Sequence, residues 1–130
     1  MSYWAYQVPE SVRDWLADHY PFKFGEHRGD HITVCLGDAF PEGWPVMAAI
    51  EVCGYGCDNG IEAFRVTVNG RLEQPRGIPL HITWSFDPLT AQAKDSSRLE
   101  FKKIENWVAE DPVRFGARLM HYSPEKDSDE

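Results

Sequence analysis

Apolar and polar residues alternate along much of the chain in short runs, a two-residue period typical of strands that are buried on one face. Gly, Pro and Asn separate the runs, as they do where a chain turns. The predicted strands cover 3–8, 31–36, 46–52, 61–68, 80–86 and 115–122. Strands in this order, joined mostly by short turns, predict an α+β fold with an antiparallel sheet.

Two segments break the alternation with the wider spacing of a helix. Residues 9–18 are predicted to be helical, with Ser11 as the N-cap. A second helix is predicted over 97–110, because its apolar residues recur at helical spacing. The glycine-rich residues 54–60 are expected to form a loop.

The pair Asn69-Gly70 is the strongest turn signal in the chain. Asn and Gly adopt the positive φ angles that a type I′ hairpin turn requires. The pair therefore predicts a hairpin whose second strand begins near Arg71, which would be a seventh strand.

The chain has 130 residues, of which 42% are hydrophobic, enough for one domain with one core. We expect this domain to span 1–122 and the acidic residues 123–130 to form a disordered tail. No apolar run approaches the ~20 residues of a membrane span, and no export signal is evident at the N-terminus. A cytoplasmic protein without a membrane partner is therefore expected. A monomer is favoured, and the oligomeric state stays open at this point.

The net charge is −8, and four acids and one lysine in the tail contribute −3 of it. Proteins that hold a long duplex neutralise its phosphates with a basic face. No cluster of Lys and Arg occurs here. The charge therefore argues against a long nucleic acid duplex and suits a small or terminal phosphate that is held locally.

The chain contains three cysteines, Cys35, Cys53 and Cys57. An odd number without an export signal does not favour a disulfide framework. The spacing of Cys53 and Cys57 would suit two of the ligands of a zinc site. No second pair follows at metal-binding spacing, however, and structural zinc takes four ligands. We therefore expect buried or half-buried thiols, no metal site and no cofactor.

A short tetrapeptide, His-Ile-Thr followed by an apolar residue, occurs at 31–34 and again at 81–84. Each copy opens a predicted strand. A single His-x-Thr on a strand is most often structural, but two such copies favour a shared site. Metal binding is the other common use of a histidine pair, yet no acid or cysteine stands beside both motifs to complete a ligand set.

The strand period gives the repeat a chemical meaning. Residues i and i+2 point to one face, so His31 and Thr33 share a face, as do His81 and Thr83. Cleavage of a phosphodiester needs one group to take a proton and another to give one, and histidine does either near neutral pH. Threonine hydroxyls can donate hydrogen bonds to the phosphate oxygens, where charge builds in the transition state.

The two motifs resemble those of the two-histidine (2H) phosphoesterase superfamily, which read His-x-Thr/Ser-x with x apolar. The stretch 81–88, followed by a lysine and serines in 93–99, is similar to the cyclic phosphodiesterase domains of fungal and plant tRNA ligases. The segments 51–56 and 61–66 are similar to the paired strands that precede the second motif in those domains.

This resemblance implies a two-lobed fold, with antiparallel sheets around a concave central cleft and a few flanking helices. It also implies that His31 and His81 are the catalytic acid and base and that Thr33 and Thr83 bind the substrate phosphate. Which histidine is the acid stays open at this point.

Three further residues are weaker candidates for substrate binding. Ser85 shares the face of Thr83, and Lys94 follows the second motif closely enough to reach a phosphate. Tyr3 and Tyr6 fall on opposite faces of the first strand, so at most one of them, with Tyr6 as the candidate, faces the cleft and stacks on a base. The remaining histidines are expected at the surface: His19, His27 and His121.

Together these features predict a metal-independent phosphodiesterase that acts on a small nucleotide or an RNA end, such as a 2′,3′-cyclic phosphate. Two alternatives stay open. The same site would serve a phage-type nuclease that degrades cyclic oligonucleotide immune signals. A non-catalytic nucleotide-binding module is the other, although a binder has no need for two proton-transfer groups.

Overall fold

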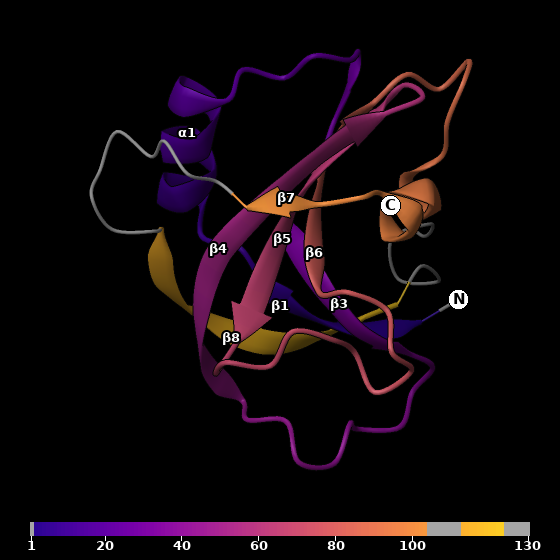
Figure 1. Cartoon of the computed structure of the whole chain (residues 1–130). Helices are drawn as coiled ribbons and strands as arrows, with labels where there is room; N and C mark the ends of the chain where they lie inside the picture. The colour runs from indigo at the N-terminus through magenta and orange to yellow at the C-terminus, as the bar shows by residue number, and fades with distance from the viewer. Residues whose placement is uncertain (1, 104–112, 124–130) are drawn as a thin grey trace.

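The computed structural model describes residues 2–103 and 113–123 (Figure 1). These residues form one eight-stranded sheet, one α-helix and one short 3-10 helix. The strands are β1 Tyr3–Gln7, β2 Glu26–His27, β3 His31–Leu36, β4 Met47–Asp58, β5 Ile61–Val68, β6 His81–Phe86, β7 Lys102–Lys103 and β8 Arg114–Tyr122. The helices are α1 Glu10–His19 and the 3-10 helix η1 Ala93–Arg98.

The strands are hydrogen-bonded in the order β2-β6-β5-β4-β8-β1-β3, with β7 added to β4. Every pairing in the described chain is antiparallel, which confirms the coarse α+β prediction. The last strand, β3, lies beside β6 near the other end of the order, although no hydrogen-bonded ladder joins these two described strands (Figure 1). The sheet therefore curls until its two ends approach each other.

One face of the curled sheet packs with α1 into the main hydrophobic core. Ile32 and Val34 of β3, Ile82 and Trp84 of β6, and Leu16 of α1 are fully buried there. The residues between them on β3 and β6 point to the opposite face. The helix η1 packs against β5 and β6.

Trp84 is the largest fully buried side chain of the described residues. Its Nε1–H donates to the Tyr20 carbonyl over 2.9 Å. The Phe22 ring stacks on its indole with centroids 4.4 Å apart, and Phe64 meets it edge-on at 5.1 Å. Offset stacking and edge contacts of this kind favour one fixed ring position. The indole therefore ties the loop after α1 to the back of β6.

The short strand β2 lies in the chain just before the first motif and pairs with the strand that carries the second. It pairs with the end of β6, and the Arg28 amide extends that ladder by donating to the Trp84 carbonyl over 2.7 Å. β3 follows β2 along the chain and lies beside β6, so that His31 and His81 line one cavity.

Gly29 lies where the chain leaves this ladder and passes over the indole of Trp84. Its φ is +101°, and a Cβ at this position would lie 2.6 Å from a ring carbon of Trp84. On its two sides, Arg13 Nε–H donates to the Arg28 carbonyl over 2.8 Å, and the Val8 amide donates to the Asp30 carbonyl over 2.9 Å. Only glycine fits this crossing.

The prediction of a loop over 54–60 is wrong, because β4 continues through this segment in its ladder with β5. The chain reverses instead at Asn59 and Gly60, whose φ angles are +49° and +82°. Gly56 serves close packing rather than a turn, since a Cβ there would lie 3.0 Å from the Glu100 carbonyl oxygen.

The predicted helix over 97–110 is wrong in its described part. The helix η1 begins earlier and ends at Arg98, and β7 comes after it. Leu99, which contributes to the helical spacing, packs instead against the small cluster around Ile61 and Phe86. Residues 104–112 lie outside the described part of the chain, as do residues 124–130 of the predicted tail.

Three smaller details also differ from the predictions. Ser11 does not cap α1, because the helix begins one residue earlier, after Pro9, and has no side-chain cap bond. The Asn69-Gly70 turn forms, but the residues after it pair only through isolated bridges. The short strand β2 was not predicted, since two residues carry no periodic signal. No helix in the described residues is long and apolar enough to cross a bilayer.

Replacing Gly29 by Ala should lower the free energy of unfolding by about 2–4 kcal/mol, because the methyl group meets the Trp84 ring at a positive φ. Gly37→Ala is the matched control: φ is +98° there, but nothing lies within 4 Å of the added carbon, so only about 1–2 kcal/mol should be lost. Urea denaturation measures both. Equal losses in the two variants would show that the Trp84 contact does not constrain the crossing.

Candidate active site

A cavity of about 270 Å³ opens between β3 and β6 on the face that carries both motifs. Its walls come from β3, β6, the 74–78 segment and η1. The residues that line it are His31, Thr33, Cys35, Leu36, Gln74, Arg76, Ile78, His81, Thr83, Ala93, Lys94 and Ser97. The structure therefore brings together all four residues of the repeated motif, from positions 50 residues apart in the chain.

His81 is held by the backbone at the start of β6. Its Nδ1 lies 2.7 Å from the Pro79 carbonyl oxygen. A carbonyl only accepts, so Nδ1 carries a proton and donates it. Burial lowers the pKa of His81, although the bond to Pro79 opposes this, and the charge of His31 lowers it further. The neutral ring, with a lone pair on Nε2, is favoured at pH 7.

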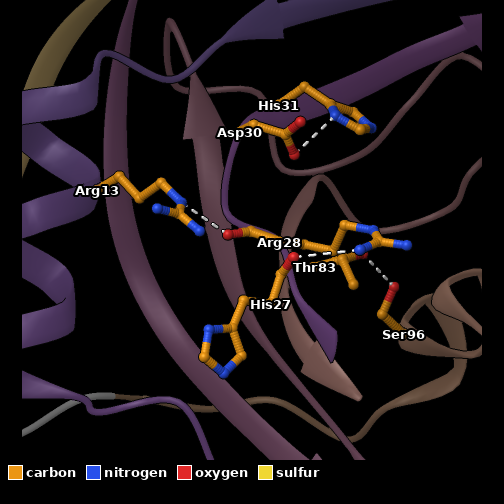
Figure 2. Close-up of polar contacts among 7 residues, drawn as sticks. All are labelled: Arg13, His27, Arg28, Asp30, His31, Thr83 and Ser96. Carbon is orange, nitrogen blue, oxygen red and sulfur yellow. Dashed lines mark hydrogen bonds and ion pairs between the residues drawn. The ribbon is translucent and has the colours of Figure 1, made fainter. Parts of the chain in front are cut away.

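Ser96 of η1 connects His81 to Thr83, the two members of the second motif. Figure 2 shows its contact with Thr83. Its Oγ lies 3.0 Å from His81 Nε2 and 2.7 Å from Thr83 Oγ1. It also lies 2.7 Å from the Ala93 carbonyl oxygen. Ser96 is fully buried. Sequence reasoning did not select it, because only the folded structure brings η1 against β6.

His31 has a different environment from His81. Its Nδ1 lies 3.2 Å from the Asp30 carboxylate (Figure 2). The hydrogen bond from His31 lowers the pKa of Asp30, so this carboxylate is charged at neutral pH. The rings of Tyr3 and Tyr122 stack on each other and lie 5.3 and 5.7 Å from the His31 ring. Asp30 therefore places a negative charge beside the His31 ring.

Thr33 lies on the open edge of β3, which pairs only with β1 in the described chain. The Gln74 side chain covers this edge by donating to the Thr33 carbonyl over 3.0 Å. No hydrogen bond to the Thr33 hydroxyl is found among the described residues, whereas the Thr83 hydroxyl contacts Ser96. The two threonines of the repeat therefore differ in what their hydroxyls touch.

The charge of the cavity is opposite to that of the protein. Arg76 and Lys94 line it, and none of its lining residues is an acid. A second cavity, of about 290 Å³ beside the β4–β5 turn, is lined by Asp58 and Asp95 and by no cation. In a chain of net charge −8, the cavity with the two motifs is therefore suited to an anion.

Two of the weaker candidates do not reach the cavity. Ser85 is fully buried, since the segment before β2 seals it: its hydroxyl donates to the Glu62 carboxylate and accepts from the Phe24 amide at 3.2 Å. Tyr6 is fully buried in the core and donates to the Pro45 carbonyl over 2.6 Å. Burial raises the pKa of Tyr6 to about 12. Proposing these residues as substrate ligands was wrong, whereas Lys94 does line the cavity.

Glu62 is a buried carboxylate that sequence reasoning missed. Tyr55 donates to it over 2.5 Å, the Lys23 amide donates over 2.8 Å, and Ser85 adds a third bond. Burial and the Glu62 contact raise the pKa of Tyr55. A carboxylate with three donors is satisfied, and it fastens the loop before β2 to the sheet.

The remaining histidines, His19, His27 and His121, lie at the surface, as expected. The three cysteines are free thiols. In the part of the chain that the structure describes, no three His, Cys, Asp or Glu side chains lie close enough together to hold a metal ion.

Comparisons with known proteins give no match: neither a scan against protein-family models nor searches of curated proteins and of solved structures find one. Function is therefore inferred from the cavity and its residues.

Replacing Tyr6 by Phe should lower the free energy of unfolding by about 1–2 kcal/mol, because the Pro45 carbonyl then loses its buried partner. Urea denaturation measures this loss. Binding of a nucleoside monophosphate to the cavity, followed by calorimetry, should not change. Weaker binding at unchanged stability would return Tyr6 to the site.

Proposed function

We propose that this protein is a phosphodiesterase that opens a 2′,3′-cyclic phosphate on a nucleotide or RNA end by two-histidine acid–base catalysis. The observation that carries the proposal is that His31, Thr33, His81 and Thr83 line one cavity whose only charged neighbours, among its lining residues, are cations. The resemblance of the two motifs to 2H phosphoesterases supports the same chemistry.

The environments of the two histidines support a division of roles. His81, which burial keeps neutral, is the general base. His31, beside the Asp30 carboxylate, is the general acid in its charged form. The attacking water forms a bond to phosphorus and its proton passes to His81. The bond from phosphorus to one ribose oxygen breaks, and His31 gives its proton to that oxygen, which leaves a nucleoside monophosphate.

The cationic lining supplies the rest of the site. Arg76 and Lys94 attract the phosphate and stabilise the charge that builds on its non-bridging oxygens. Thr33 lines the same cavity, and its hydroxyl can donate a hydrogen bond to one of those oxygens. These groups act without a cofactor.

The size of the cavity favours a small substrate over a cyclic oligonucleotide. Pockets for drug-sized ligands are roughly 300–1,000 Å³, and this one, at about 270 Å³, lies below that range. It suits one phosphodiester with part of a nucleoside. Cyclic dinucleotides and 2′,5′-linked oligomers therefore belong in the substrate panel as the alternative outcome.

Replacing His31 or His81 by Ala should each lower kcat for a 2′,3′-cyclic mononucleotide by about 10²–10⁴-fold, the usual effect of removing a positioned acid or base. The double variant should lose far less than the product, because the two groups act in one turnover. His19→Ala, an exposed histidine on α1, is the control with unchanged kcat. Near-normal turnover in His31→Ala would end the two-histidine mechanism.

Activity should survive excess EDTA, because neither proton transfer nor the cationic lining requires a divalent ion. The assay is hydrolysis of the same cyclic mononucleotide with and without chelator. Complete loss of rate, restored by added metal, would contradict the proposal and direct attention to other residues, such as Cys53 and Cys57.

A further inference from the structure

The hydroxyl of Ser96 is hydrogen-bonded to both the proposed base and the threonine of the same motif. We propose that Thr83 and Ser96 form a hydrogen-bonded relay that carries the proton of the attacking water from the cavity to Nε2 of His81. This inference rests on the proposed function and makes the two threonines of the repeat unequal: Thr33 binds phosphate, and Thr83 passes a proton.

The direction of the relay follows from counting protons. The Pro79 carbonyl requires a proton on Nδ1 of His81, so Nε2 of the neutral ring is an acceptor. Ser96 has one hydroxyl proton and two acceptors for it, the Ala93 carbonyl oxygen at 2.7 Å and Nε2 of His81 at 3.0 Å, and the relay operates when this proton turns to Nε2. The contact between Ser96 and Thr83 then has only one donor left, the Thr83 hydroxyl. The Thr83 proton therefore points inward, toward Ser96, whichever of its two acceptors Ser96 serves.

Thr83 is the end of the hydrogen-bonded relay that is open to the cavity. Thr83 lines the cavity, whereas Ser96 is fully buried and does not. With its proton donated to Ser96, the Thr83 oxygen presents lone pairs to the cavity. A water molecule there has an acceptor in Thr83, and through it a path to Nε2.

The transfer balances at every atom. Water gives a proton to Thr83 Oγ1 as its oxygen bonds to phosphorus, Thr83 passes its own proton to Ser96, and Ser96 passes its own to Nε2. Each hydroxyl ends with one proton, and the charge ends on His81. The Nε2–H then donates to Ser96, whose proton is free to turn to the Ala93 carbonyl at 2.7 Å.

Burial also excludes Ser96 as a nucleophile. A serine 3.0 Å from a histidine nitrogen has the spacing of a nucleophile and its base. With no exposed surface, the Ser96 oxygen cannot reach a substrate atom. It acts through Thr83 and His81 and is a positioning residue. A capping box between Gln92 and Asp95 fixes the turn of η1 that carries it.

The charges that face His81 are His31 from β3, Lys94 from η1, and Arg65, which is opposite His81 in the β5–β6 ladder. Of these, the charge of His31 lowers the pKa of His81 and so disfavours its charged form. The Ser96 oxygen is the acceptor that offsets this for the charged ring, because hydrogen bonds to charged groups are the stronger ones. Without it, we expect His81 to titrate at lower pH.

The first test needs no substrate. In the full chain, ¹⁵N NMR of the imidazoles should show neutral His81 with its proton on Nδ1. In Ser96→Ala the midpoint of the His81 titration should move to lower pH by about one unit. Ser97→Ala, whose hydroxyl bonds only the Lys94 carbonyl among the described residues, is the control for an unchanged midpoint. A neutral His81 with its proton on Nε2 would overturn the relay, even if Ser96→Ala fails to fold.

The second test uses turnover of a 2′,3′-cyclic mononucleotide. Thr83→Ala should lower kcat about 10²-fold at little change in KM and move the acidic limb of kcat/KM to lower pH, and Thr83→Ser should recover both. Thr33→Ala should leave that limb in place. If Thr83→Ala keeps the wild-type kcat and the wild-type acidic limb of kcat/KM, the relay is overturned. A chain that turns over no substrate on the panel, yet keeps the Nδ1–H form of His81, would reject the proposed function and not the hydrogen-bond chain.

Discussion

The segment that joins β2 to β3 has to pass over the indole of Trp84, and the candidate site depends on this crossing. Trp84 is fixed from three sides, by the Tyr20 carbonyl and by the rings of Phe22 and Phe64. Gly29 lets the backbone lie against the indole. The strand β2 pairs with β6, and β3, which follows it, lies beside β6 without a hydrogen-bonded ladder between the two in the described chain. One buried aromatic residue thus supports the connection that leads to the first motif.

The two copies of the motif are alike in sequence but not in surroundings. His31 sits beside a carboxylate, and His81 is enclosed, with a carbonyl on one nitrogen and a buried hydroxyl on the other. The acid and base roles that we propose arise from these partners, and from burial, rather than from the motif. Repetition supplies two similar groups, and the fold makes them different.

Much of the framework could be predicted from the sequence where the pattern is local. The strands β3, β5 and β8 follow the alternation of apolar residues, and the i, i+2 spacing correctly assigned His31 and Thr33 to one face. Glycines misled the prediction of β4, because a glycine that permits close packing cannot be told from one that makes a turn without its neighbours in space.

Residues whose roles depend on distant contacts could not be predicted. Ser85 shares the strand face of Thr83 but is covered by the loop that Glu62 fastens, and Tyr6 is turned into the core toward Pro45. Ser96 had no signal of its own, because its partners lie 13 and 15 residues away in the chain. Periodicity assigns a face to a residue, and tertiary packing decides whether that face is open.

The central claim is that His31 and His81 contact one bound phosphate. Titration of the full chain with adenosine 2′-monophosphate, followed by NMR of the imidazole signals, tests it most directly. The account predicts that the signals of His31 and His81 move together with one shared Kd, while those of His19 and His121 stay in place. Movement of only one of the two motif histidines, or different affinities for them, would contradict it.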